Sequence, residues 1–273
     1  MGAVDVDLTG QVLSVNYTDS ANDSLNLAIN TTGYDASGAN VTNGTGTITE
    51  LNVTFGNTSN TSNFTLTDAS QNLTGGLTIS SQFNDVTISS DVTAANISIQ
   101  AEDVGLNGNV TTTGNQTYQS VSGSGGIEFN GTYSAGGGII ELLGEGTFGV
   151  SLGLNGDTTI DAGTGEFSVQ KGTSSTDPGG NIVSQGQGES YDLTITAGNI
   201  TVPAGIGVAS VGNSNLPSPE LEDFTINGVG QVGLNTPTVS TNGDISLNPQ
   251  IRIYQDTTFI SGAGAINFTG GVN

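Results

Sequence analysis

Cysteine, histidine and cationic side chains are absent or nearly absent from this sequence of 273 residues. Without cysteine the chain can form neither a disulfide framework nor a thiolate metal site. Lys171 and Arg252 are its only cations against 25 acidic residues, so the formal net charge is -23. Nucleic acids and anionic membrane surfaces are bound by clusters of Lys and Arg, and the composition therefore argues against both partners. The acidic excess favours solubility in a salty, extracellular medium.

Long apolar runs are also missing. No segment approaches the roughly 20 apolar residues of a transmembrane helix, so we expect no membrane insertion of this segment. Residues 1–10 (MGAVDVDLTG) contain neither a basic nor an apolar region of the kind found in signal peptides. If the protein is exported, we expect this chain to be a mature form or an internal fragment.

Short strand signals recur along the whole chain, whereas helix signals are almost absent. Thr, Val, Ile and Gly predominate, and apolar residues alternate with polar ones over three to five positions. Gly, Asn-Gly, Asp and Ser separate these segments, and such residues are typical of turns. The chain contains 43 glycines, but the regular spacing of its aliphatic residues argues against disorder. The pattern predicts an all-β protein.

Two stretches, residues 149–172 and 248–271, are versions of one another. They share an Asp-Thr-Thr triplet and three glycines, which lie at Asp157, Thr158, Thr159, Gly163, Gly165 and Gly172 in the first copy and at Asp256, Thr257, Thr258, Gly262, Gly264 and Gly271 in the second. Further along, the similar strands at 223–228, 243–248 and 264–270 start about 20 residues apart. Self-similarity of this kind indicates a repeat architecture.

This spacing predicts a right-handed parallel β-helix (β-solenoid) with coils of about 20 residues. At about 4.8 Å per coil the chain would form roughly 12–14 coils and a rod of about 60 Å. The offset between the two similar stretches would then correspond to five coils. We expect one domain over residues 1–273, with a more irregular part over 1–84 and loops that leave the coils near 171–190 and 213–221. No polar cap is evident at either end.

Several phrases of the sequence resemble the passenger repeats of bacterial autotransporters and of filamentous-haemagglutinin-like exoproteins. They are NVTTTGNQTY at 109–118, GGIEFNG at 125–131, GDTTIDAGTGEFSV at 156–169 and GDISLNPQIRIYQDTTFISGAGAINFTGG at 243–271. The resemblance covers mainly residues 85–170 and 190–273, and the N-terminal third departs from it. It implies a right-handed β-helix outside the cell that serves adhesion or aggregation. It supplies no catalytic residues.

Asn-x-Ser/Thr sequons are dense toward the N-terminus. Examples begin at Asn16, Asn30, Asn40, Asn52, Asn57, Asn60, Asn63, Asn72, Asn96, Asn109, Asn115 and Asn130. One interpretation is a glycosylated surface. The other, which we favour, is turn chemistry in which each Asn occupies a corner of the chain.

Metal binding and catalysis are the remaining hypotheses for a site. Asp5 and Asp7 share a strand face, and Asn155, Asp157 and Asp256 lie near turns, so oxygen-rich corners could hold Ca²⁺ weakly. The repeat signature of dedicated Ca²⁺ sites is missing, and the sequence leaves any metal site undefined. No cofactor site is indicated.

Parallel β-helices also host polysaccharide-degrading enzymes, which need two carboxylates about 5–9 Å apart. Any two outward acids on adjacent coils could satisfy that spacing. Lys171 and Arg252 are too few to bind an acidic sugar, and in the strand QIRIY we expect Arg252 to be an outward, solvated or ion-paired side chain. We assign no catalytic residue and expect that the chain is not an enzyme.

The sequence therefore favours a structural or adhesive segment of a large secreted or cell-surface protein, with a rigid rod as its working part. Cell-surface glycans are candidate ligands, contacted by four tyrosines that we expect to be exposed, namely Tyr118, Tyr133, Tyr191 and Tyr254. Two alternatives remain open. One is a self-assembling sheath or filament subunit, in which like subunits associate end to end or laterally. The other is a polysaccharide-degrading β-helix enzyme.

Overall fold

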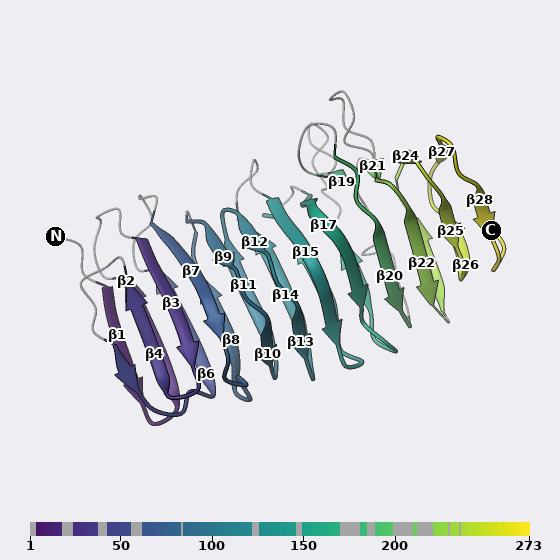
Figure 1. The fold of residues 1–273 in the computed structure, drawn as a ribbon. Coiled ribbons are helices and arrows are strands. Elements are labelled where there is room, and N and C mark those ends of the chain that lie inside the picture. Colours follow the sequence, from purple (N-terminus) through teal and green to yellow (C-terminus); the bar gives the residue numbers. More distant parts are fainter. Residues whose placement is uncertain are drawn as a thin grey trace.

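The computed structural model is an elongated succession of short strands (Figure 1). It describes residues 4–17, 24–37, 43–55, 62–82, 84–121, 126–145, 149–169, 181–184, 189–198, 210–211, 221–228, 230–234 and 236–273. These ranges contain 28 strands and no helix, which confirms the prediction of an all-β chain. Most strands pair in parallel with a strand from an earlier and a later part of the chain.

The strands form three files, and each file is a row of parallel strands. The first file runs through β2 (Val12–Tyr17), β6 (Glu50–Phe55), β8 (Gly76–Ser80), β11 (Ile97–Ala101), β14 (Gln116–Ser120), β16 (Ile140–Leu143) and β18 (Phe167–Val169). Near the C-terminus, β23 (Gln231–Leu234) and β26 (Gln250–Ile253) form a separate parallel pair.

The second file contains ten strands. They are β3 (Ser24–Asn30), β7 (Asn63–Ala69), β9 (Val86–Ile88), β12 (Val104–Leu106), β15 (Gly126–Ala135), β17 (Ser151–Asp161), β19 (Asn181–Ser184), β21 (Ser210–Val211), β24 (Thr238–Thr241) and β27 (Thr258–Ser261).

The third file shares two long strands with the second. It runs through β10 (Val92–Ala94), β13 (Val110–Thr112), the later halves of β15 and β17, β20 (Leu193–Ala197), β22 (Phe224–Gly228), β25 (Ile245–Leu247) and β28 (Ile266–Phe268). A register shift between Phe129 and Gly131 marks the place where β15 passes from one file to the other.

The N-terminal end is built differently, from antiparallel strands. β1 (Val4–Thr9) lies antiparallel on β2, β4 (Gly33–Ser37) lies antiparallel on β3, and β5 (Gly44–Thr45) continues from β4. Asp5 and Asp7 point outward from β1 and are exposed, on one face of the strand as predicted. Within the described residues, β1 is the outermost strand of the sheet that contains the first file, and its two exposed carboxylates lie at this end of that sheet.

The core lies between the files and consists of in-register apolar ladders. In the second file one ladder runs through Leu25, Phe64, Val86, Val104, Ile127, Leu152 and Ile182, and a later part of it pairs Val239 with Phe259. Alternate side chains along each strand point inward, as the burial of β11 and β20 shows. The period-2 alternation of the sequence is therefore the feature that fixes which residues become core.

Successive members of a file are less evenly spaced along the chain than predicted. Val92 pairs with Val110 and Ile245 with Ile266, at intervals of 18 and 21 residues. Val12, however, pairs with Glu50, an interval of 38 residues. The ten strands of the second file replace the predicted 12–14 coils, and at about 4.8 Å per step they span about 45 Å. Longer connections between strands account for the smaller number.

The two similar stretches of sequence do not occupy equivalent positions. Thr158 lies in the third file, where it pairs with Leu193, whereas Thr258 lies in the second file and pairs with Thr238. The two copies therefore lie in different files. Along the second file, four strand pairings separate β17 from β27, whereas the sequence predicted five coils between the copies. The repeated unit is a strand with its corner, which recurs on different faces of the molecule.

The two predicted loops are only partly within the described residues. Within 171–190, β19 forms a parallel strand between β17 and β21, so the expectation of a loop is wrong for Asn181–Ser184. The apolar Ile182 is buried there and supplies an inward position in a segment that has few apolar residues. Residues 171–180 and 213–220 lie outside the described part of the chain, while Leu221 is buried and bridges to Thr241.

Candidate functional site

The exposed aromatic residues are fewer than the sequence suggested. Tyr118 and Tyr133 are completely buried, so the expectation that they contact glycans is wrong. Tyr133 stacks on Phe129 with ring centroids 3.9 Å apart and donates its hydroxyl to the carbonyl oxygen of Leu106 at 2.8 Å. Tyr118 donates to Oε1 of the buried Gln116 at 3.0 Å. Both rings are buried because their hydroxyl groups have partners inside the core.

The other two tyrosines are accessible. Tyr191 is half-buried, and its hydroxyl is hydrogen-bonded to the carboxylate of Glu189. Tyr254 is 43% exposed, and the guanidinium of Arg252 lies 4.9 Å from its ring centroid. Arg252 itself points outward and is exposed, as predicted. Its stacking on Tyr254 is a cation–π contact of the kind Arg makes on aromatic rings.

Four aspartates form a ladder along one corner of the third file. The backbone N–H of Asp192 donates to Oδ1 of Asp157 at 3.1 Å. The N–H groups of Asp223, Asp244 and Ala265 donate in the same way to Asp192, Asp223 and Asp244. Each carboxylate therefore accepts a hydrogen bond from the strand that follows, and the ladder ties neighbouring strands together at their starts.

This arrangement gathers negative charge. Burial raises the pKa of Asp192 above its ordinary value, and the charge of Asp157 raises it further. The hydrogen bond from the Asp223 N–H acts in the opposite direction but does not cancel these effects. A second pair behaves similarly, since burial and the charge of Asp103 raise the pKa of Asp85. The hydrogen bonds of the ladder therefore join neighbouring strands, whereas the charge of its partly buried carboxylates destabilises the fold at neutral pH.

The predicted metal-ligand candidates do not converge. Asp5 and Asp7 lie on β1 at the N-terminal end, Asp157 is part of the ladder, and Asp256 precedes β27 near the other end. The side-chain amide of Asn155 donates to Glu128 at 2.8 Å. Within the described ranges no group of three or more His, Cys, Asp or Glu side chains is arranged to hold a metal ion.

Several sequon asparagines occupy corners of the fold. Oδ1 of Asn96 accepts from the N–H of Asn115, Oδ1 of Asn109 accepts from the N–H of Thr132, and Oδ1 of Asn115 accepts from the N–H of Ile139. These contacts are the predicted turn chemistry, in the same form as the aspartate ladder. Asn40, Asn57 and Asn60 lie outside the described residues.

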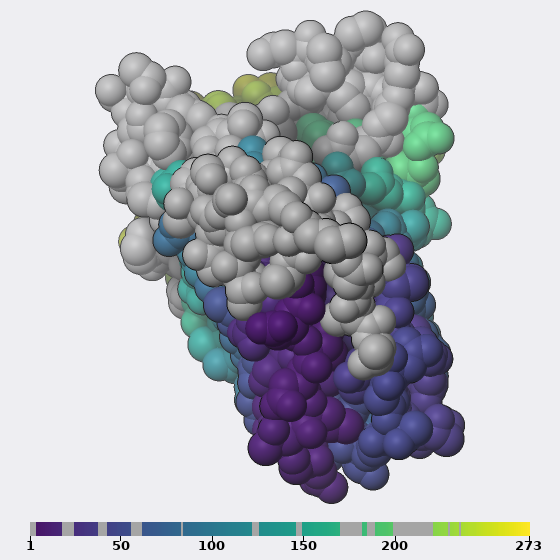
Figure 2. Space-filling model, turned by 90° about the vertical axis from the view of Figure 1, so that its left-hand side faces the viewer, coloured from purple at the N-terminus to yellow at the C-terminus, as the bar shows by residue number. Residues whose placement is uncertain are grey.

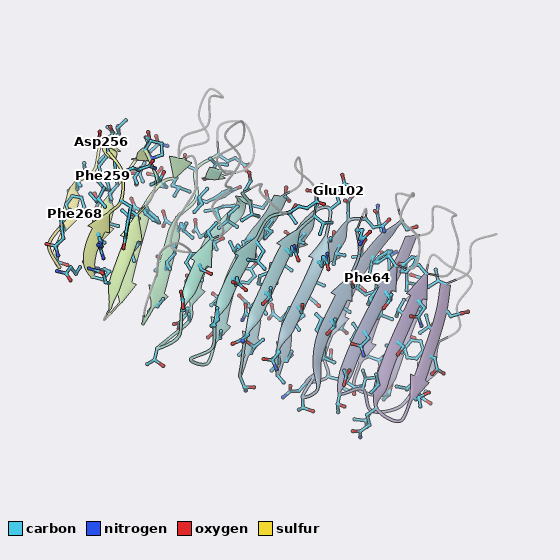
Figure 3. All side chains as sticks on the ribbon, turned by 180° about the vertical axis from the view of Figure 1, so that it is seen from behind. Phe64, Glu102, Asp256, Phe259 and Phe268 are labelled. Carbon is cyan, nitrogen blue, oxygen red and sulfur yellow. The ribbon has the colours of Figure 1, made fainter. Side chains whose placement is uncertain are left out.

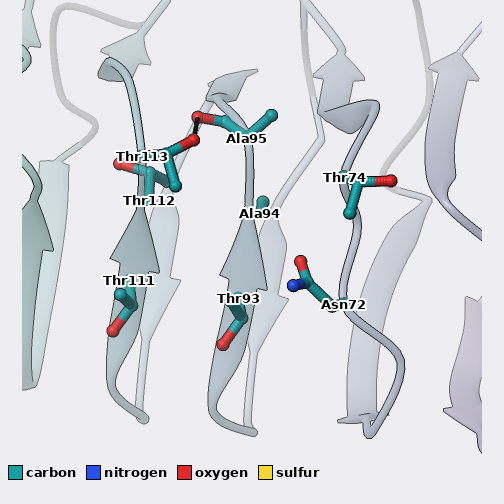
Figure 4. Close-up of a pocket in the computed structure, with 8 residues that line it drawn as sticks. All are labelled: Asn72, Thr74, Thr93, Ala94, Ala95, Thr111, Thr112 and Thr113. Carbon is teal, nitrogen blue, oxygen red and sulfur yellow. Dashed lines mark hydrogen bonds between the residues drawn. The ribbon is translucent and has the colours of Figure 1, made fainter.

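A shallow surface depression of about 130 Å³ lies beside β10 and β13, the first two strands of the third file (Figure 4). It is lined by Asn72, Thr74, Thr93, Ala94, Ala95, Thr111, Thr112 and Thr113. The lining has small, neutral side chains, and neither a carboxylate nor a cation reaches it. It therefore presents hydroxyl groups and methyl groups to solvent but no group suited to acid–base chemistry.

The C-terminal end is the most apolar exposed region among the described residues. Figure 3 shows Phe259, Phe268 and Asp256 together at this end, far from Phe64 in the body of the molecule. Large hydrophobic side chains that are at least 40% exposed include Tyr254, Ile260, Ile266 and Val272, all in the last strands or beside them. The opposite end, seen in Figure 2 with β1 in purple, presents the exposed carboxylates of Asp5 and Asp7.

Comparison with known proteins gave no match among family models, curated proteins or solved structures. The described residues also contain no helix long and apolar enough to cross a membrane.

The sequence did not point to the C-terminal end as a special surface. Phe259 and Ile266 belong to the same alternating patterns as buried residues elsewhere, so those patterns do not reveal their exposure. The sequence analysis also missed the aspartate ladder. Its signal is an Asp directly before an alternating segment: Asp192, Asp223 and Asp244 directly precede β20, β22 and β25, and Asp157 precedes the half of β17 that pairs with β20.

Proposed function

We propose that the chain is a right-handed parallel β-helix that serves as a rigid rod within an extracellular or cell-surface protein. The observation that carries the proposal is the register of the three files. Strand after strand pairs in parallel without losing alignment, as in the run from Val92 through Val110, Tyr133 and Ile160 to Ile195. Right-handedness follows from the strong preference of parallel crossover connections for that hand.

A rod of this kind works through its stiffness and its surface. Stiffness comes from main-chain hydrogen bonds between strands, reinforced by the Asp and Asn ladders at the corners. The outward-facing positions of the strands are mainly Thr, Ser and Asn, as in the paired residues Thr132, Thr159, Thr194 and Thr225. Such a surface suits weak contacts with cell-surface glycans, and the resemblance to autotransporter passenger repeats belongs to the same proposal.

Electron microscopy of the purified protein tests the rod. We expect isolated particles of constant length, near 45 Å along the axis for ten strands at about 4.8 Å. Spherical or variable particles would contradict the proposal. A glycan array tests adhesion separately, and the absence of binding to every glycan would contradict the adhesive part while leaving the rod intact.

A second candidate, a subunit that assembles with copies of itself, is favoured by one observation. Among the described residues, four of the five large hydrophobic side chains that are at least 40% exposed lie on or beside the last strands, namely Tyr254, Ile260, Ile266 and Val272.

A further inference from the structure

Asparagine and aspartate have the same structural role at the corners of this fold. Oδ1 of Asp91 accepts the backbone N–H of Asn109 at 2.8 Å, and Oδ1 of Asn109 accepts the N–H of Thr132 at 2.9 Å. The two residues are successive members of one corner ladder and stand directly before β10 and β13. Because only the oxygen takes part, turn chemistry explains an acceptor at these corners but not the choice of an amide over a carboxylate.

The choice between the two residues changes along the chain. Fourteen of the seventeen asparagines in residues 1–130 begin an Asn-x-Ser/Thr sequon, against two of the eleven in residues 131–273. In the later part the same pattern, an acceptor followed two residues on by a hydroxyl, starts from Asp157, Asp192, Asp223 and Asp244. The alternation of inward and outward positions explains the hydroxyl in both parts. It does not explain why one part uses asparagine and the other aspartate.

Three of the sequons leave the amide nitrogen of the asparagine accessible. Asn96, Asn109 and Asn115 are exposed, and the Oδ1 atom of each accepts a backbone N–H at 2.9, 2.9 and 3.0 Å. Within the described residues, the Nδ2 atoms of these three side chains have no hydrogen-bond partner. An amide that is substituted at nitrogen keeps its carbonyl oxygen, so a group attached to Nδ2 leaves each corner hydrogen bond in place.

The rest of each of these three sequons also has a suitable orientation. The middle residue is buried, and the hydroxyl-bearing residues point outward, namely Ser98, Thr111 and Thr117. Each sequon therefore presents its amide and its hydroxyl on the same outer face of the strand. The surface is where an acceptor for N-linked glycosylation must lie.

Two other sequons differ from these three. Nδ2 of Asn30 donates to Asp35 at 2.9 Å, and Nδ2 of Asn52 donates to Glu50 at 2.8 Å. Both asparagines are also only partly exposed. Accessible acceptor nitrogens are therefore a property of particular corners and not of every sequon.

We propose that Asn96, Asn109 and Asn115 are N-glycosylation sites, which take a sugar from a donor linked to a nucleotide or lipid diphosphate. Nδ2 attacks the anomeric carbon of the donor sugar, and a C–N bond forms as the bond between that carbon and the phosphate oxygen breaks. The diphosphate leaves with the electron pair of that bond, and Nδ2 loses one proton. A glycosyltransferase of the producing cell catalyses the transfer. This inference goes beyond the rod, because it depends on accessible amides and not on stiffness.

Avoidance of charge is the other explanation for asparagine at these corners. Corners in the same part of the chain nevertheless use aspartate, since Oδ1 of Asp91 and Oδ1 of Asp103 accept the N–H groups of Asn109 and Gly126. A carboxylate is therefore tolerated in a neighbouring member of the same ladder. Charge avoidance alone predicts unmodified asparagine, so a measurement of modification separates the two explanations.

Mass spectrometry of the chain isolated from the cells that produce it tests the proposal. Cleavage before aspartate releases residues 91–102, in which Asn96 begins the only sequon. We expect part of this peptide to be heavier by the mass of one or more sugar residues, with fragment ions that place the added mass on Asn96. The peptide over residues 103–156 should carry added mass on Asn109 and Asn115. Unmodified asparagine at all three positions would overturn the proposal.

Two single variants within residues 91–102 separate modification from turn chemistry. Ser98→Ala removes the sequon but keeps Oδ1 of Asn96 as the acceptor for the Asn115 N–H, so it should abolish the added mass and leave the fold intact. Thr93→Ala, which also removes an exposed hydroxyl, is the matched control and should keep the added mass. Added mass on Asn96 that survives Ser98→Ala would overturn sequon-directed glycosylation.

Electron microscopy of the same material tests the rod separately. Unmodified asparagine in rod-shaped particles would overturn the glycosylation sites alone. Modified asparagine in spherical particles would overturn the rod alone.

Discussion

Phe259 and Phe268 meet edge to face at the C-terminal end, with ring centroids 5.1 Å apart and ring planes at 88°. Each ring is the last member of an apolar ladder, one from the second file and one from the third. The contact joins two files across the core in the same way that Tyr118 and Phe129, 5.4 Å apart and edge to face, join the first and second files in the middle of the chain. Edge-to-face aromatic contacts between files thus recur in the middle of the chain and at its last strands.

The position of a phenylalanine along the stack should determine how much it stabilises the fold. Phe224 is fully buried, and Phe224→Ala should reduce the free energy of unfolding by about 3–5 kcal/mol. Phe268 is only half-buried, so Phe268→Ala should reduce it by about 1–2 kcal/mol. Denaturant unfolding at a concentration where the chain is monomeric measures both. Equal effects would contradict the difference in burial between the two rings.

The hydroxyl of Tyr133 should contribute to stability. It donates to the carbonyl oxygen of Leu106 and accepts from the N–H of Asn130 at 3.0 Å, so Tyr133→Phe removes one buried and one partly buried hydrogen bond to the backbone. We expect a loss of about 1–3 kcal/mol in the free energy of unfolding. Tyr254→Phe, at an exposed ring, is the control and should change stability by less than about 0.5 kcal/mol.

The aspartate ladder should make stability depend on pH. The pKa of folded Asp192 lies above the ordinary value of 3.8, so the folded chain holds this proton more tightly than the unfolded chain does. Stability from this group is fully present below the ordinary value and is lost as pH rises through the raised pKa. Asp192→Asn keeps an oxygen acceptor for the Asp223 N–H and removes the charge.

We therefore expect Asp192→Asn to raise the thermal midpoint at pH 7 by about 1–2 °C. The gain should shrink as pH falls below 3.8, where the aspartate is itself protonated. Asp5→Asn, on the exposed face of β1, is the control outside the ladder. Thermal unfolding at several pH values measures the difference, and a gain that grows at low pH would contradict the ladder account.

Close approach of neighbouring strands requires glycine at Gly165. A Cβ there would lie 1.9 Å from the carbonyl oxygen of Gly138, so Gly165→Ala forces the backbone apart. We expect a loss of about 1–3 kcal/mol in the free energy of unfolding. At Gly105 the nearest atom to an added Cβ is 3.8 Å away, and Gly105→Ala should be tolerated within about 0.5 kcal/mol.

The strands and their inward positions could be predicted from the sequence, because alternation at Leu152 and Leu154 or Ile195 and Leu193 is a local property. The burial of Tyr133 could not, since it depends on the Leu106 carbonyl 27 residues away. The prediction that the two similar stretches occupy equivalent positions was also wrong. A turn that contains Asp and Thr can precede a strand of the second file or of the third. The antiparallel cover at the N-terminus depends on pairing between β1 and β2, which alternation does not reveal.

The exposure of Ile266 also could not be predicted from the sequence, for a physical reason. Ile266 and its pairing partner Ile245 have the same local pattern, yet Ile266 is 40% exposed and Ile245 is fully buried. Residue patterns indicate which face is apolar, whereas burial depends on whether another strand follows.

Distances between spin labels along one file test the stacked architecture most directly. Asn26 is four pairings from Glu128 and six pairings from Val183 along the second file, and all three side chains belong to the outward register. Cysteine pairs introduced at Asn26 and Glu128, and at Asn26 and Val183, should give label separations of about 19 Å and about 29 Å, at about 4.8 Å per step. Separations that do not increase with the number of pairings, or a single broad distribution for both pairs, would contradict the rod.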